Sequence, residues 1–150
     1  MLKKTITYED WNGVVRTEDF YFNLTRTEAI NLEYGLVPGK SLTESMQELI
    51  RSSNVGDSLR IAQELVLASY GVKSDDGRRF MKSDEIRKAF EENPAYDQLY
   101  ISLATDADAF ADFFLGVMPK SLTEKMGDNP KERLFEEARK LGGENLTIVH

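Results

Sequence analysis

The sequence predicts an α+β fold that is predominantly α, with an N-terminal β-hairpin packed on a bundle of about five to six helices. Two observations carry this prediction. Apolar residues alternate along residues 4–24 on both sides of an Asn-Gly pair, a pattern typical of a hairpin. Beyond them, helix-capping residues recur, each followed by apolar residues at helical spacing, as far as Pro119. We expect residues 1–119 to form a single globular domain and residues 120–150 to form a loosely attached C-terminal helix and tail.

The hairpin is expected to turn through an odd-length loop, Trp11 to Gly13. A loop of only Asn12 and Gly13 would pair odd with even positions and divide the apolar residues between the two faces of the hairpin. The odd-length loop keeps them on one face, with Asp10 opening a type I turn and Gly13 in the left-handed conformation. The residues of this apolar face are Ile6, Tyr8, Phe20, Phe22 and Leu24. Because an isolated hairpin is marginal in water, this face must pack on helices or on another chain.

The first two helices are predicted from capping boxes. Thr25 is a suitable N-cap and Glu28 completes the box, so a short helix should run to about Tyr34 and end within residues 35–39. The same signal recurs at residues 41–44 and predicts a second helix. The apolar stripe of the second helix consists of Leu42, Met46, Leu49 and Ile50.

A third helix is predicted to open at Gly56-Asp57 and to end at Gly71. Its apolar residues occupy more than one face, which predicts the central helix of the fold. These residues are Leu59, Ile61, Ala62, Leu65, Val66, Ala68 and Tyr70. Residues 72–82 are polar and contain the turn signal Asp75-Asp76-Gly77, so we expect a surface loop there.

Three capping signals predict the helices that follow. Ser83 precedes two acidic residues, Pro94 suits a first helical position, and Thr105 with Asp106 begins the last strong helix before Pro119. The apolar faces are Tyr96, Leu99, Tyr100 and Leu103 in one helix and Ala107, Phe110, Ala111, Phe114 and Val117 in the next. Residues 131–141 should form one more amphipathic helix, and the terminal residues LTIVH are either a frayed tail or a small strand.

Composition narrows the classes of function. The chain has no Cys and a single His, His150, so it lacks thiolate metal sites and a His-based triad. Nineteen basic against 26 acidic residues give a net charge of −7, which disfavours nucleic acid as a partner. No apolar run approaches the roughly 20 residues that span a bilayer, so we expect no membrane partner and no signal segment. We also expect no cofactor, since no phosphate-binding loop or metal motif is present.

Three polar clusters are interpreted as structural. Asp106, Asp108 and Asp112 could suggest a metal or acid/base site, but capping and the helix dipole explain them. The loop around Gly77 fails the EF-hand pattern, because Ser83 stands where a bidentate Glu is required. The basic residues Arg78, Arg79, Lys82, Arg87 and Lys88 lie among six acidic ones, which favours a solvated face of mixed charge.

The last strong helix carries more apolar side chains than one stripe can hide. Phe113 and Leu115 point away from the face of Phe110 and Phe114, so either two internal partners cover this helix or part of it is an interface. The candidate partner-binding residues are Phe110, Phe113, Phe114, Leu115, Val117 and Met118, with Leu134 and Leu141 of the C-terminal helix. If Phe113 is in an interface, Phe113→Asp should weaken partner binding while leaving the fold intact.

Three blocks of the sequence resemble the tail assembly chaperones of long-tailed phages that infect Gram-positive hosts. They are TITYEDWNGVVRTEDFYFNLT, SYGVKSDDGRRFMKSDEIRKAF and PAYDQLYISLATDADAFADFFLGVMP, and together they span most of residues 5–119. The resemblance implies a non-catalytic protein of the host cytoplasm that binds the tape measure protein and recruits tail-tube subunits. It also implies self-association, frequent expression of a longer frameshifted form, and absence from the mature virion. A structural tail or connector component that stays in the virion is the alternative.

Overall fold

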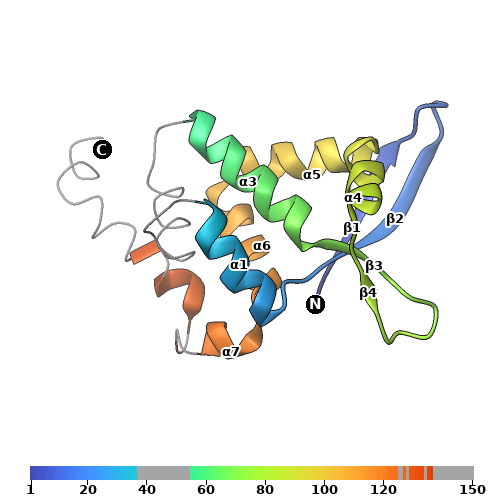
Figure 1. The fold of residues 1–150 in the computed structure, drawn as a ribbon. Helices are drawn as coiled ribbons and strands as arrows, with labels where there is room; N and C mark the ends of the chain where they lie inside the picture. The colour runs from blue at the N-terminus through green and yellow to red at the C-terminus, as the bar shows by residue number, and fades with distance from the viewer. Residues whose placement is uncertain (37–54, 125–126, 128, 134, 137–150) are drawn as a thin grey trace.

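The computed structural model describes residues 1–36, 55–124, 127, 129–133 and 135–136, and it is mostly helical with an N-terminal antiparallel hairpin, as predicted (Figure 1). The elements are β1 (Leu2–Glu9), β2 (Val15–Phe22), α1 (Arg26–Leu36), α3 (Val55–Ser69), β3 (Tyr70–Lys73), β4 (Phe80–Met81), α4 (Asp84–Glu91), α5 (Pro94–Thr105), α6 (Ala107–Val117) and α7 (Lys120–Thr123). The helix predicted from residues 41–44 lies outside the described residues.

The hairpin has the predicted odd-length loop and register. Even positions pair with even positions along its whole length, as in Leu2 opposite Phe22. The Asp10 amide donates to the Val14 carbonyl at 2.8 Å, the Gly13 amide donates to the Asp10 carbonyl at 2.9 Å, and Gly13 has φ +80°. Only glycine adopts that conformation without strain. The apolar set therefore shares one face, which packs on the helices: Tyr8, Phe20, Phe22 and Leu24 are buried and Ile6 is half-buried.

The prediction of a surface loop at residues 72–82 is wrong in part. β3 pairs antiparallel with the end of β2, placing Tyr21 opposite Gly71, and β4 pairs with β3, which extends the sheet to the order β1-β2-β3-β4. The third helix consequently ends at Ser69, before the predicted Gly71, because the next residue enters the sheet. A Cβ on Gly71 would lie 2.7 Å from the Phe80 ring, so glycine permits this close approach. The predicted turn at residues 75–77 is present, and Gly77 has φ +72°.

The predicted helix starts are confirmed with small shifts. Thr25 and Glu28 form the capping box, with backbone-to-side-chain hydrogen bonds of 3.0 and 3.1 Å, although α1 continues to Leu36. The Ser83 hydroxyl accepts from the Ile86 amide at 3.0 Å. Pro94 occupies the first turn of α5, and Asp106, rather than Thr105, is the N-cap of α6 because Thr105 still belongs to α5.

An aromatic cluster joins the hairpin to the helices. Phe22 meets Phe113 of α6 edge-on with ring centroids 5.2 Å apart, and Tyr70 stacks on Phe90 of α4 at 4.1 Å. Such pairs add roughly 0.5–1.5 kcal/mol each beyond the burial of apolar area. α3 packs against α1, α5 and α6, consistent with its predicted central position (Figure 1).

The segment after Pro119 contacts the body of the fold. Residues 130–133 and 135–136 are helical, which agrees with part of the predicted amphipathic helix. The Lys131 ammonium lies 3.0 Å from the Asp108 carboxylate and 3.1 Å from that of Asp112, and Phe135 packs against the core. The predicted division into a domain of residues 1–119 and a loosely attached remainder stays a prediction.

Candidate interaction surface

The structure gives most of the predicted partner-binding residues of α6 a place in the core. Phe113 and Val117 are 0% exposed, and Phe110, Phe114 and Met118 are also buried. The hairpin packs on one side of α6, and α5 and α3 pack on it as well, so these five side chains are covered within the chain. A partner would reach them only if α6 moved, and their role in binding stays a prediction.

The other three predicted partner-binding residues are not among the buried residues of α6. Leu115 is half-buried and packs against the core cluster. Leu134 and Leu141 lie outside the described residues. Gly116 approaches the hairpin closely, since a Cβ there would lie 3.0 Å from the Leu2 side chain. The C-terminal half of α6 thus packs against the start of β1.

The tip of the hairpin exposes an apolar surface that the sequence analysis missed. Trp11, Val14 and Val15 are 83%, 51% and 68% exposed, and we call these three residues the hairpin tip. The Trp11 indole N–H donates to the Glu92 carbonyl at 2.9 Å, which ties the tip to the C-terminal end of α4. Two features of the sequence could have indicated this surface. One is a tryptophan in a turn, and the other is a pair of consecutive valines, of which one must face away from the core.

Charged groups beside the hairpin tip are held by hydrogen bonds and an ion pair. Asp10 accepts hydrogen bonds from the Asn12 and Val14 amides at 2.8 and 2.9 Å and forms an ion pair with Arg16 at 2.6 Å. The hydrogen bond from Arg16, followed by that from the Val14 amide, lowers the pKa of Asp10.

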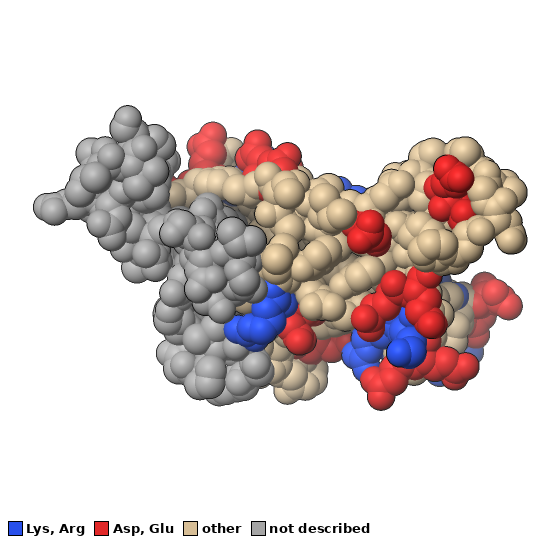
Figure 2. Space-filling view, turned by 90° about the horizontal axis from the view of Figure 1, so that it is seen from above, with Lys and Arg blue, Asp and Glu red and all other residues tan. Residues whose placement is uncertain are grey.

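Acidic side chains outnumber basic ones on the face that Figure 2 shows, which agrees with the net charge of −7. The exposed apolar residues therefore belong to a predominantly acidic molecule.

The acidic residues of α6 have structural partners, as interpreted from the sequence. The Asp106 carboxylate accepts from the Asp108 and Ala109 amides at 3.0 and 3.2 Å and so caps the helix. Asp108 and Asp112 both bind Lys131. Among the described residues, no three His, Cys, Asp or Glu side chains gather closely enough to hold a metal ion.

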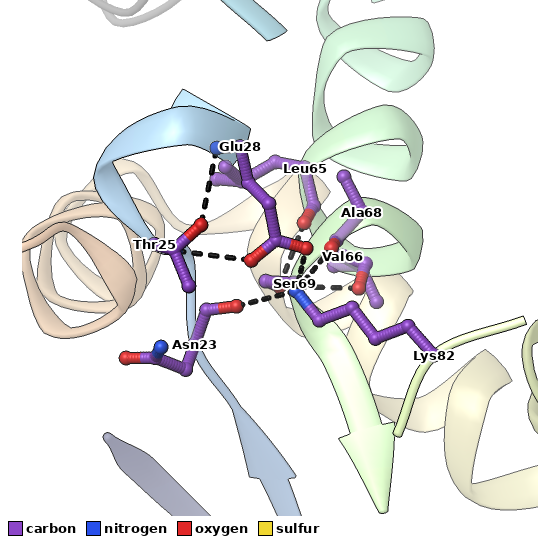
Figure 3. Close-up of polar contacts among 8 residues, drawn as sticks. All are labelled: Asn23, Thr25, Glu28, Leu65, Val66, Ala68, Ser69 and Lys82. Atoms are coloured by element: carbon purple, nitrogen blue, oxygen red, sulfur yellow. Dashed lines mark hydrogen bonds and ion pairs between the residues drawn. The ribbon is translucent and has the colours of Figure 1, made fainter. Parts of the chain in front are cut away.

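One member of the predicted mixed-charge face is directed inward instead. The side chain of Lys82 is only 12% exposed, and its ammonium donates to the Asn23 carbonyl at 2.7 Å and to the Ala68 carbonyl and Glu28 carboxylate at 2.8 Å each (Figure 3). These contacts join the end of β2, the start of α1 and the C-terminal end of α3. We call Lys82 and its three acceptors the lysine clasp. By contrast, Arg78, Arg79 and Lys88 are exposed.

The lysine clasp shifts the titration of both charged members. Burial lowers the pKa of Lys82, and the hydrogen bond and charge of Glu28 offset part of that effect. Burial acts to raise the pKa of Glu28, but hydrogen bonds from Lys82 and the Thr25 amide outweigh it, so the net pKa of Glu28 is lowered. The partners of Glu28 thus stabilise its carboxylate despite its desolvation.

We predict that the lysine clasp weakens in acid. A carboxyl group with a lowered folded-state pKa stabilises the fold above its unfolded pKa, about 4.3 for Glu, and loses this contribution as pH falls through the folded value. Urea midpoints measured from about pH 7 down to about pH 3 should fall less steeply below about pH 5 for Glu28→Gln than for the wild type. Glu64→Gln, which changes an exposed carboxylate, is the control. Parallel curves for Glu28→Gln and the wild type would contradict the prediction.

No helix in the described ranges is both long enough and apolar enough to cross a bilayer.

Comparison with known proteins identifies the family. A family model described as phage tail assembly chaperone matches residues 1–147. Neither the curated proteins nor the solved structures include a significant match. The match extends beyond the three blocks quoted above and includes the segment after Pro119, which those blocks do not reach. Because it covers nearly the whole chain, this protein belongs to the phage tail assembly chaperone family.

Proposed function

We propose that this chain is a non-catalytic chaperone that binds the tape measure protein and recruits tail-tube subunits, the major tail protein, while the tail is built. The observation that carries the proposal is the family match over residues 1–147. We further propose that the chain acts in the host cytoplasm, self-associates and is absent from the mature virion.

The physical properties of the chain suit this role. A tape measure protein is long and aggregation-prone, so its partner must offer apolar surface while keeping the complex in solution. The hairpin tip supplies such a surface, and its three residues are exposed on a turn that the Trp11 hydrogen bond holds in place. Aromatic side chains of this kind dominate binding energies at protein interfaces. The net charge of −7 favours solubility of the complex.

The hairpin tip adds to the contacts predicted from the sequence. Three residues predicted from the sequence remain part of the proposal. Leu115 is only half-buried, and Leu134 and Leu141 lie outside the described residues. Phe110, Phe113, Phe114, Val117 and Met118 would take part only through a displacement of α6.

We predict that Trp11→Ala weakens binding to the tape measure protein by at least about tenfold, because central aromatic residues contribute most to such interfaces. The measurement is co-purification and titration of the two proteins after co-expression, with thermal unfolding to verify the fold. Ile101→Ala is the matched control, since Ile101 is a half-exposed apolar residue on α5. Equal affinity of the Trp11 variant and the wild type would remove the hairpin tip from the proposal.

A structural component retained in the virion is the second candidate function, and it makes a different prediction. Mass spectrometry of purified virions would detect a retained subunit at several copies per particle. The chaperone proposal expects the chain in infected cells and not in finished particles.

A further inference from the structure

Strand β1 has one edge that the rest of the described chain leaves unpaired. It stands at the end of the sheet order β1-β2-β3-β4. The Asp10 amide donates to the Val14 carbonyl just before β2, and hydrogen-bonded pairs alternate along an antiparallel ladder. Even positions of β1 therefore direct their backbone groups toward β2, and odd positions direct theirs toward the open edge. No backbone hydrogen bond from another part of the described chain reaches that edge. An eight-residue edge of this kind is a template for pairing with a further strand.

The sequence of β1 is complementary to itself when reversed. Lys3 and Glu9 stand at opposite ends of the strand on its solvent face, with Thr5 and Thr7 between them, and all four side chains are exposed. Antiparallel pairing of two copies about Ile6 places Lys3 of each copy opposite Glu9 of the other. It also places Thr5 opposite Thr7, so every position on this face meets a compatible residue.

The core-facing side of β1 suits the same register. Ile6 would lie opposite Ile6 of the second copy, which would cover a side chain that its own chain leaves half-exposed. Lys4 would lie opposite Tyr8, a pair that brings no like charges together.

Other registers lack this complementarity. A shift that places Thr5 opposite itself brings Lys3 opposite Thr7 and leaves Glu9 beyond the paired segment. A shift that places Thr7 opposite itself leaves Lys3 opposite the turn. Registers that pair odd with even positions put the core-facing side of one copy beside the solvent face of the other.

We propose that a second copy of this chain docks on the open edge of β1, antiparallel and centred on Ile6, to form one continuous sheet across a two-fold axis. This inference rests on the self-association proposed above and specifies its interface. The two-fold arrangement makes the contact isologous and closed, so a discrete dimer forms through this edge rather than a filament.

Lysines on an edge strand can instead protect the strand from pairing with another chain. Exchanging the charges of Lys3 and Glu9 distinguishes this protective role from a role in pairing. Lys3→Glu opposes two pairs of like charges in the dimer and should weaken it by at least about tenfold, whereas Lys3→Glu with Glu9→Lys should restore it to within about threefold. Analytical ultracentrifugation of the full chain, with any purification tag at the C-terminus, measures both. A dimer that is unchanged or strengthened by Lys3→Glu would overturn the proposed pairing.

Cysteine cross-linking tests the register directly, because the natural chain has no Cys. Opposed residues of a pair that lacks mutual hydrogen bonds have Cα atoms about 4.5 Å apart, within disulfide range. Ile6→Cys should therefore form a disulfide-linked dimer on mild oxidation. Thr17→Cys, an exposed position on the inner strand β2, should not, and Thr5→Cys should cross-link far less than Ile6→Cys.

The outcomes distinguish the interface from self-association in general. A wild-type chain that stays monomeric at every accessible concentration would overturn both the self-association and the β1 pairing. A dimer that neither cross-links through Ile6→Cys nor responds to Lys3→Glu would overturn the β1 pairing and leave self-association standing. Efficient cross-linking at position 6 together with rescue by the exchanged charges supports the inference.

Discussion

Phe113→Asp is expected to unfold the protein. The Phe113 side chain is 0% exposed and meets Phe22 of the hairpin edge-on at 5.2 Å. Truncating a buried phenylalanine to alanine already costs about 3–5 kcal/mol, and aspartate adds the cost of a buried carboxylate without a partner. Because whole domains are stable by only about 5–15 kcal/mol, this single change should remove most of the folded population. Circular dichroism and urea unfolding are the measurements.

This expectation revises the hypothesis that Phe113→Asp would act on partner binding alone. Ile101→Asp is the control, since it introduces the same charge at a half-exposed apolar position on the neighbouring helix α5. Ile101→Asp should cost much less than Phe113→Asp, because a carboxylate at a half-exposed position stays hydrated. A Phe113→Asp chain with the stability of the wild type would show that α6 is not packed as described.

Loss of the lysine clasp is the second large effect that we expect. Lys82→Met keeps an unbranched side chain that is one atom shorter, but it leaves the Asn23 and Ala68 carbonyls and the Glu28 carboxylate without their shared donor. Unsatisfied buried groups cost about 1–3 kcal/mol each, and the partial exposure of Glu28 reduces its share. We therefore expect a loss of about 2–4 kcal/mol in the free energy of unfolding.

A matched control and a double variant make this test specific. Lys88→Met removes an exposed lysine from α4 and should leave stability within about 0.5 kcal/mol of the wild type. Combining Lys82→Met with Glu28→Gln should cost less than the sum of the single changes, because the two side chains share one interaction. Equal stability of the Lys82 and Lys88 variants would mean that the lysine clasp contributes nothing.

Local features of the fold were predictable because neighbouring residues determine them. The loop of the hairpin followed from parity, since only an odd-length loop places Tyr8 and Phe20 on one face. The capping box of Thr25 and Glu28 needed only side-chain chemistry within four residues. Strand β3 was missed because it has four residues, and it pairs with β2 across about 50 positions of sequence, a distance that local patterns do not report.

The candidate surface was harder to predict, because exposure depends on tertiary packing. An apolar helix such as α6 can be covered on two sides or can bind a partner, and the local sequence does not report that Phe22 packs against Phe113. Trp11 was interpreted through the conformation of its turn rather than through its exposure. Lys82 was assigned to a solvated face because its three acceptors lie in other parts of the chain.

We propose above that this chain is needed to build the tail but is no part of it. The most direct measurement is complementation of a phage genome that lacks its coding sequence, with tails counted by electron microscopy and virion proteins identified by mass spectrometry. The account predicts that tails are absent without the chain, return when it is supplied, and do not contain it. Normal tails in its absence, or several copies of the chain in each purified virion, would contradict the account.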